Sequence, residues 1–313
     1  MTQWPWLGDD AATAQRRADL WRLLGPRPAL KKSPSGVLLK TETTANARVE
    51  SWRLTLNSEE PVPAILMHPL NIPPRGLVIY CHAHGNRFER GKDELLVGRP
   101  AIQNPPYGET LAETGFAALA IDHWCFGERS FGETRSERAM VKRLLWEGKT
   151  LWGYRVHDTL VSLEWARTQP GLAELPVTAL GLSMGSTMAI WAAALDPTID
   201  ACIDLCCLAE YDALIESGGF DQHGEYFFVP RLLSAFTAAE ISALIAPRHH
   251  LSLVGRDDPL TPAKGVDSIN RALRTAYVAL GQPDRWQQTV FECGHQETAA
   301  MRDAALKFLR DVG

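Results

Sequence analysis

From residue 76 onward, short runs of apolar residues alternate with longer segments in which apolar residues recur at helical spacing. Runs of this length, rich in β-branched residues, are typical of strands buried on both faces of a sheet. The runs are Leu77–Cys81, Phe116–Ile121, Val177–Leu180, Ile199–Leu205, Leu251–Val254 and Gln288–Phe291. Helical spacing is clearest over Arg138–Gln169, Ser186–Leu195 and Lys264–Leu280. Strands that alternate with helices predict an α/β fold with a mostly parallel central sheet flanked by helices.

The first 75 residues follow a different pattern. Apolar side chains among polar neighbours predict a helix over residues 10–25, and prolines interrupt the chain directly after it. We therefore expect residues 1–45 to form an N-terminal helical extension that packs on a main domain of residues 46–313. Alternation over Val49–Leu56 predicts a half-buried strand, and Ala64–Met67 would be its hairpin partner.

A long connection separates two of the predicted strands. About 45 residues lie between Leu205 and Leu251, which is too long for a bare loop in a compact domain. We expect this connection to contain helices and to form a small cap insertion over about residues 208–245. The aromatic cluster Phe220–Pro230 lies within it.

The residues Gly181-Leu182-Ser183-Met184-Gly185 fit the pattern G-x-S-x-G between a predicted strand and an apolar helix. In that context the motif predicts a nucleophile elbow, a sharp turn that raises the Ser183 hydroxyl above the sheet. The helix begins at the reacting centre, so the backbone N–H of Met184 can donate to a developing oxyanion. The alternative, a glycine–serine turn without function, fits this strand–turn–helix context less well.

A serine hydroxyl needs a base to take its proton and an acid to orient that base. His295 is the one histidine after the last predicted strand, on a glycine-containing loop before the terminal helix. Two aspartates, Asp257 and Asp258, compete for the role of acid after the strand Leu251–Val254. Pro259 holds Asp258 in the turn, so we favour Asp258, whereas Asp257 could be a turn-former that bonds its own backbone.

The order Ser183, Asp258, His295 resembles that of the α/β-hydrolase superfamily over residues 47–313. Within this superfamily, the chain resembles the dienelactone hydrolase and acetyl xylan esterase-like branch of carboxylesterases. The resemblance lies in three segments, Cys81–Asn86, Ile121–Arg129 and Ala246–Arg248. The resemblance implies that the backbone N–H of Asn86 is the second oxyanion donor, with Gly85 as the alternative. The chain lacks the HGGG pattern of many lipases.

Four further residues are predicted to line the substrate pocket: His84, Trp124, Phe126 and Tyr226. Trp124 and Phe126 follow a predicted strand and would stand at the rim of the pocket, and Tyr226 belongs to the cap. His82 and His84 could in principle share a metal ion, but no further ligand lies nearby and no HExxH motif occurs. We therefore expect neither a metal nor a cofactor, and we interpret His84 as shaping the oxyanion loop.

Composition and charge limit the partners and the cellular compartment that we expect for this protein. The net charge of −5 gives no reason to expect a nucleic-acid partner. The six cysteines form no CxxC pair, no signal peptide is apparent in the first residues, and the apolar run Met188–Leu195 is too short to cross a bilayer. We expect a soluble, reduced, cytoplasmic protein with a small-molecule partner, no membrane partner, and an oligomeric state that the sequence leaves open.

Together these features predict a serine hydrolase that cleaves a carboxylic ester with a small or medium acyl group through an acyl-enzyme. One alternative is a peptidase like prolyl oligopeptidase, which shares the elbow and the residue order. The sequence shows no long repeat-built domain before the hydrolase region, which such peptidases have. The other alternative is a binding protein that keeps the fold without chemistry. Such proteins usually lose a member of the triad, and all three residue types are present here.

Overall fold

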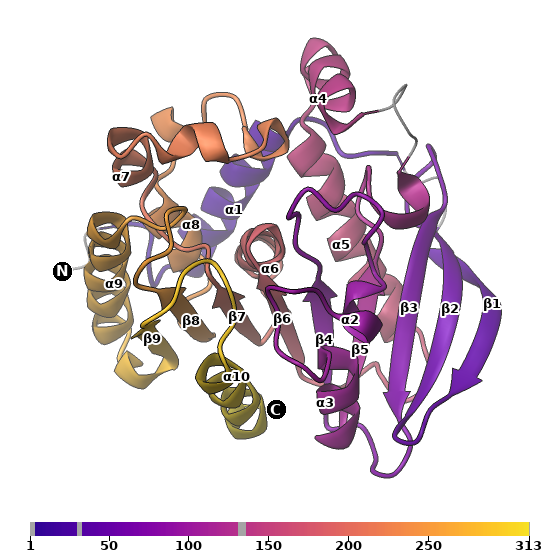
Figure 1. The fold of residues 1–313 in the computed structure, drawn as a ribbon. Coiled ribbons are helices and arrows are strands. Elements are labelled where there is room, and N and C mark those ends of the chain that lie inside the picture. Colours follow the sequence, from indigo (N-terminus) through magenta and orange to yellow (C-terminus); the bar gives the residue numbers. More distant parts are fainter. Residues whose placement is uncertain (1–3, 30–32, 131–135, 313) are drawn as a thin grey trace.

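A computed structural model describes residues 4–29, 33–130 and 136–312, and it has a nine-stranded sheet between two layers of helices (Figure 1). The strand order is β1-β2-β3-β5-β4-β6-β7-β8-β9. The strands are β1 (Ser35–Thr43), β2 (Ala47–Thr55), β3 (Val62–Pro69), β4 (Gly76–Cys81), β5 (Phe116–Ile121), β6 (Val177–Leu182), β7 (Ala201–Leu205), β8 (His249–Gly255) and β9 (Trp286–Phe291). Every strand expected from the apolar runs is observed, so the prediction of an α/β fold is confirmed.

The sheet is parallel from β5 to β9 and antiparallel from β1 to β3, and β3 pairs with β5 antiparallel. The register pairs Cys81 with Gly181, Gly181 with Asp204, and Gly255 with Phe291. Because these residues lie at the carboxyl ends of their strands, the loops that follow them gather at one edge of the sheet. Polar chemistry in α/β proteins is generally found at this edge.

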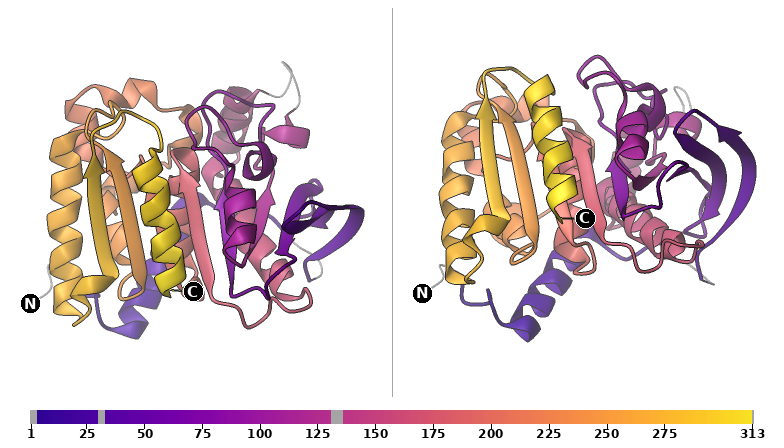
Figure 2. Two further views of the ribbon diagram at one scale, coloured as in Figure 1. Left: turned by 60° about the horizontal axis from the view of Figure 1, so that its bottom comes forward. Right: turned by 90° about the horizontal axis from the view of Figure 1, so that it is seen from below.

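Helices cover both faces of the sheet (Figure 2), and a hydrophobic core lies between the sheet and the helices on each face. Helices α3 (Tyr107–Glu113) and α10 (Ala299–Val312) bury one face. The other is buried by α5 (Leu151–Arg167), α6 (Met184–Leu195), α8 (Ala238–Ala243) and α9 (Ala263–Ala279). The central strands β4 and β5 are apolar and buried along their whole length, which explains the continuous apolar runs there in the sequence.

The helical pattern over Arg138–Gln169 forms two helices, α4 (Glu137–Trp146) and α5. Gly148 lies between them with φ +69°, a conformation that favours glycine, and Thr150 then caps α5 by accepting the N–H of Gly153. The short helix α2 (Glu94–Val97) and the 3-10 turns η1 (Gly127–Arg129) and η6 (Pro283–Arg285) occupy loops. In the described part of the chain, no helix has the length and hydropathy needed to cross a membrane.

The N-terminal region corrects one expectation. Helix α1 (Asp10–Leu24) is observed as predicted, and Leu20 and Leu24 are buried in the core it shares with α5 and α6. Strand β1, however, lies within the predicted extension of residues 1–45 and pairs with β2. The boundary near residue 45 therefore falls inside a hairpin. Strand β1 gave no alternating signal because, as an edge strand, it is exposed along nearly its whole length.

The connection between β7 and β8 folds as short helices. They are α7 (Tyr211–Glu216), the 3-10 turns η3 (Gly219–Gln222), η4 (Glu225–Phe227) and η5 (Leu232–Ser234), and α8. Figure 2 shows this orange segment at the end of the sheet where the parallel strands finish. It therefore stands over the edge at which the loops carrying Ser183 and His295 meet.

Candidate active site

Ser183 lies on a tight turn between β6 and α6, with φ +57° and ψ −121°. A positive φ is costly for a residue other than glycine, so the surrounding packing must maintain it. The flanking glycines allow this packing, because helix α6 passes very close to strand β4. A Cβ atom added to Gly185 would lie 1.9 Å from the carbonyl oxygen of Cys81, and one added to Gly181 would lie 2.3 Å from the Gly185 backbone.

We expect Gly185→Ala to lower the unfolding free energy by roughly 3 kcal/mol or more, because the methyl group meets backbone that cannot move aside cheaply. Gly219→Ala is a matched control, since its nearest neighbour is the Ser217 side chain at 3.2 Å. Urea unfolding of both variants measures the difference. Equal stability of the two variants would contradict the close approach of α6 to β4.

The structure brings Ser183, His295 and Asp258 together. His295 Nε2 lies 2.9 Å from Ser183 Oγ, and His295 Nδ1 lies 2.8 Å from Asp258 Oδ2. Asp258 Oδ1 accepts the N–H of Leu260 at 2.9 Å, which fixes the carboxylate. The order hydroxyl, imidazole, carboxylate allows the hydroxyl to donate to Nε2 while Nδ1–H donates to the buried carboxylate.

Asp258 rather than Asp257 faces the histidine. Asp258 is 3% exposed, whereas Asp257 is exposed and donates its backbone N–H to the carbonyl oxygen of Cys293. The two loops run close together, because a Cβ atom on Gly255 would lie 2.4 Å from the carbonyl oxygen of Gly294.

Glu297 holds the loop that carries His295, and sequence reasoning missed it. Its buried carboxylate accepts the hydroxyl of Tyr107 at 2.6 Å, the N–H of Gln103 at 2.8 Å and the guanidinium of Arg302 at 2.8 Å. These partners come from α3, from the loop before it and from α10. An acidic residue two positions after the base was the available signal, but its partners Gln103 and Tyr107 are distant in sequence.

The oxyanion loop corrects another expectation. The backbone N–H of Asn86 donates to His84 Nδ1 at 3.1 Å, so this group is already engaged. Gly85 also lines the cavity, and its N–H has no hydrogen-bond partner among the described residues. Met184 is the first residue of α6, and the first N–H groups of a helix have no acceptor within the helix. Among the described residues, the N–H groups of Gly85 and Met184 are therefore free to donate near Ser183.

A cavity of about 220 Å³ opens beside Ser183 and His295. The oxyanion loop, the first turns of α6 and the cap enclose it. Of the four residues predicted to line it, His84 and Tyr226 do so. The cap contributes Tyr211, Gln222, His223, Tyr226, Phe227 and Ile241. Burial lowers the pKa of His223 below its usual value.

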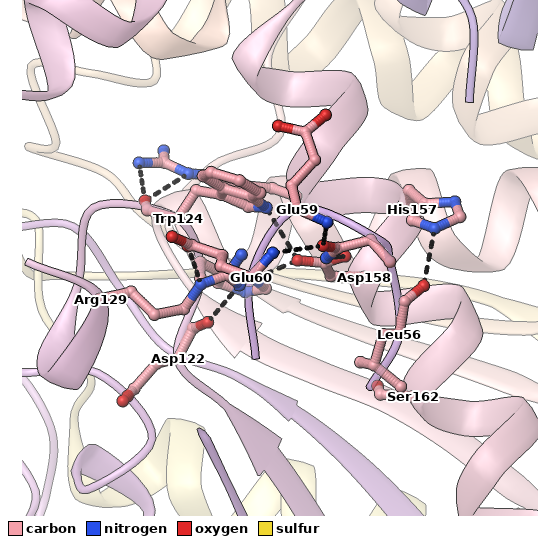
Figure 3. Close-up of polar contacts among 12 residues, drawn as sticks. Leu56, Glu59, Glu60, Asp122, Trp124, Arg129, His157, Asp158 and Ser162 are labelled. Atoms are coloured by element: carbon pink, nitrogen blue, oxygen red, sulfur yellow. Dashed lines mark hydrogen bonds and ion pairs between the residues drawn. The ribbon is translucent and has the colours of Figure 1, made fainter. Parts of the chain in front are cut away.

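Trp124 and Phe126 were expected at the rim, but they do not line this cavity. Their loop folds inward from the end of β5, and the two side chains are 3% and 0% exposed. Phe126 packs edge-on against the rings of His82 and His84. Trp124 Nε1 donates to Asp158 Oδ2 at 2.8 Å, which turns the indole away from the cavity (Figure 3).

Asp158 on α5 is the centre of a buried polar cluster beneath this loop (Figure 3). It accepts the amide of Asn57 at 2.8 Å and the Arg129 guanidinium at 2.8 Å, and Arg129 also donates to Glu60 at 2.7 Å. The segment Ile121–Arg129, singled out in the sequence, thus ties the loop after β5 to α5 and to the hairpin β2–β3. Its role is structural.

His82 and His84 do not face a common site. His82 accepts the N–H of His123 at 3.2 Å, and His84 Nε2 lies 2.8 Å from Glu137 Oε2. Burial lowers the pKa of His82 to about 3. Among the described residues, no group of three or more His, Cys, Asp or Glu side chains is arranged to hold a metal ion.

A known protein is similar in sequence to this chain over nearly its whole length. No family model matches the chain. It is 40% identical over 298 residues to the Bacillus subtilis (strain 168) protein named "Putative hydrolase YtaP", covering 95% of this chain and 98% of the relative. At this identity and coverage the two chains share a family.

Solved structures of esterases have the same fold. A promiscuous CE15 esterase from a marine bacterial metagenome superposes with a TM-score of 0.71 at 13% identity, covering 97% of this chain and 92% of that one. The glucuronoyl esterase from Solibacter usitatus gives 0.68 at 14% identity, covering 97% and 94%. The acetyl xylan esterase from Paenibacillus sp. R4 gives 0.64 at 16% identity, covering 98% and 96%. At such identities the likeness concerns the fold.

Proposed function

The chain belongs to the α/β-hydrolase family of this Bacillus subtilis protein, and on that premise we propose that it hydrolyses carboxylic esters through an acyl-enzyme formed on Ser183. The observation that carries the proposal is the pair of contacts at His295, 2.9 Å to the Ser183 hydroxyl and 2.8 Å to the Asp258 carboxylate. Such an arrangement activates a serine for attack on an acyl carbon.

Each step has a residue in place. Ser183 Oγ attacks the carbonyl carbon while His295 Nε2 takes its proton, and Asp258 stabilises the resulting imidazolium. The N–H groups of Met184 and Gly85 donate to the oxyanion. The intermediate collapses, the alcohol leaves with the proton from His295, and the acyl group stays on Ser183. Water, deprotonated by the same imidazole, then releases the carboxylic acid.

The size of the cavity supports a small or medium acyl group. Aromatic side chains of the cap, Tyr211, Tyr226 and Phe227, stand along its wall together with the polar Gln222 and His223. Pockets of this kind bind apolar groups and orient them through a few hydrogen bonds. The esterase-like fold of the neighbouring structures agrees with an ester substrate, which the experiment below tests.

The test uses p-nitrophenyl esters from acetyl to dodecanoyl, chromogenic peptide amides and a fluorophosphonate probe. We expect hydrolysis of the shorter esters, much slower cleavage of amides, and labelling of Ser183. Faster cleavage of amides than esters would favour the peptidase. Absence of both hydrolysis and labelling in folded protein would favour a binding protein.

Phe227 should set the upper limit of acyl length. Cap residues also line a second, apolar groove of about 240 Å³, here called the outer groove, and Tyr211 and Phe227 line both spaces. We expect Phe227→Ala to join the groove to the cavity and raise kcat/KM for octanoyl relative to acetyl esters by about tenfold, because each added methylene gains apolar contact.

The matched control is Phe228→Ala. Phe228 is 39% exposed and lines the outer groove without lining the cavity. Its removal should leave the chain-length profile unchanged. A Phe227→Ala enzyme with the parental profile would show that this ring does not limit the acyl chain.

A further inference from the structure

Arg155 on α5 is a buried cation that the proposed reaction does not use. Its side chain is 0% exposed, within a helix whose other buried residues are mostly apolar. Removing a charge from water costs several kcal/mol unless its hydrogen bonds are fully replaced. The groups that contact Arg155 therefore indicate the role of this buried charge.

The guanidinium of Arg155 contacts both the nucleophile elbow and the loop after β5. Its Nη1 lies 3.3 Å from Met184 Sδ, on the residue that follows Ser183. Its Nε and Nη2 donate to the carbonyl oxygen of Trp124 at 3.2 and 2.8 Å. Because a guanidinium is a rigid planar fork, these contacts fix its orientation.

Glu137, the first residue of α4, carries the contact on to the oxyanion loop. Arg155 Nη2 donates to Glu137 Oε1 at 2.5 Å, and Glu137 Oε2 lies 2.8 Å from His84 Nε2. Since His84 Nδ1 accepts the N–H of Asn86, the ring proton is on Nε2 and is donated to Glu137. Burial alone would raise the pKa of Glu137, but Arg155 and His84 outweigh burial and lower this pKa, so Glu137 is ionised.

The same groups hold the wall of the cavity. The imidazole of His84 stacks on Tyr226 of the cap, with ring centres 4.6 Å apart and planes inclined by 14°. The Arg155 guanidinium carbon lies 4.9 Å from the Tyr226 ring and 5.1 Å from the Phe126 ring. These distances allow cation–π attraction, which is stronger away from water.

The oxyanion loop needs such support. Gly85 and Asn86 have φ values of +52° and +53°, and two successive left-handed residues form a conformation that an isolated chain adopts poorly. The Asn86 N–H bond to His84 closes the loop, and the Glu137 bond to the same ring anchors it to α4. Arg155 joins this anchor to Met184.

We propose that Arg155 is a positioning residue which, through Glu137 and Met184, holds the loop His84–Asn86 against the nucleophile elbow, so that the N–H groups of Gly85 and Met184 converge on one oxyanion. This inference rests on the proposed ester hydrolysis. Because the network supports groups that act most strongly in the transition state, its loss lowers kcat more than it raises KM.

The experiment measures kcat and KM for p-nitrophenyl acetate in Arg155→Met, Arg155→Lys, Glu137→Gln and the double variant Glu137→Gln/Arg155→Met. We expect kcat to fall by about 10- to 100-fold in Arg155→Met and Glu137→Gln, while KM changes by less than about threefold. The Lys variant should retain more activity than the Met variant. The double variant should lose no more than the worse single variant, because both act in one network.

Arg248→Met is the matched control. Arg248 donates to carbonyl oxygens of Ala193, Asp196, Ile199 and Leu244 near the opposite end of α6. It therefore reports the general cost of losing a largely buried arginine, which should appear as lower thermal stability with kcat near that of the parent.

The outcomes separate the inference from the proposed function. The positioning role would be overturned if Glu137→Gln and Arg155→Met fold and keep the parental kcat. It would also be overturned if Arg248→Met shows an equal fall in kcat. In both cases, activity of the parent enzyme would still uphold ester hydrolysis. If Arg155→Met does not fold, the near-isosteric Glu137→Gln decides by the same criterion. A parent that neither cleaves esters nor reacts with fluorophosphonate overturns the proposed function, and the inference with it.

Discussion

Ser183→Ala should lower kcat for p-nitrophenyl acetate by a factor on the order of 10³ or more while the fold persists. The change removes the attacking oxygen, so no acyl-enzyme can form. The helix that follows keeps its start, because the backbone N–H of Ser183 donates to the carbonyl oxygen of Leu205 at 2.9 Å whichever side chain is present. The substitution removes only the hydroxyl group of Ser183 and should therefore not destabilise the turn.

Initial rates at saturating ester, circular dichroism and fluorophosphonate labelling test this prediction together. Ser217→Ala is a suitable control, since Ser217 lies in the cap, where its hydroxyl donates to the carbonyl oxygen of Leu214 and accepts the N–H of Gly219. It should keep full activity and full labelling. A folded Ser183→Ala enzyme that cleaves the ester at the parental rate would refute nucleophilic attack by this residue.

The second large effect distinguishes the neighbouring aspartates. Asp258→Asn should lower kcat by about 10⁴, because an amide cannot stabilise the imidazolium and can hold His295 in the wrong tautomer. Asp257→Asn should keep kcat within about twofold of the parent. Its side chain is exposed, and the contact to Cys293 comes from its backbone, which the substitution leaves intact.

The pair is closely matched, since both changes remove one negative charge from the same turn. Any effect of net charge on substrate binding is therefore shared, and the difference in kcat isolates the bond to His295 Nδ1. Comparable losses in the two variants, with both proteins folded, would contradict the assignment of Asp258 as the acid.

The parallel sheet and the elbow could be predicted because their signals are local. A strand buried on both faces must be apolar throughout, as in Phe116–Ile121, where the predicted and observed bounds agree. The elbow can be recognised from a short motif, because the close packing of α6 against β4 requires glycine at two positions within five residues. Pro259 likewise restricts its own neighbour, so the preference for Asp258 over Asp257 needed no tertiary information.

The sequence could not predict which way the loop after β5 turns. Trp124 and Phe126 look like pocket residues because aromatic side chains at a strand end are common in binding sites. Their actual place depends on Asp158 and Arg155, about 30 residues further along the chain, which bond to Trp124 from below. The hydrogen bond from the Asn86 N–H to His84 likewise depends on a residue distant in sequence, because Glu137 orients the His84 ring.

By itself the sequence determined the α/β fold, the family and the three side chains proposed for the chemistry, because periodicity, turn motifs and residue order are properties of contiguous chain. Only the tertiary structure decided the edge strand β1, the Gly85 N–H as the free donor, the extent of the cavity and the network of Arg155 and Glu137. These depend on hydrogen bonds between segments far apart in sequence. Such bonds leave no local pattern in the sequence. Each partner of a buried ion pair is a single residue in its own segment, so neither a motif nor a periodicity marks it.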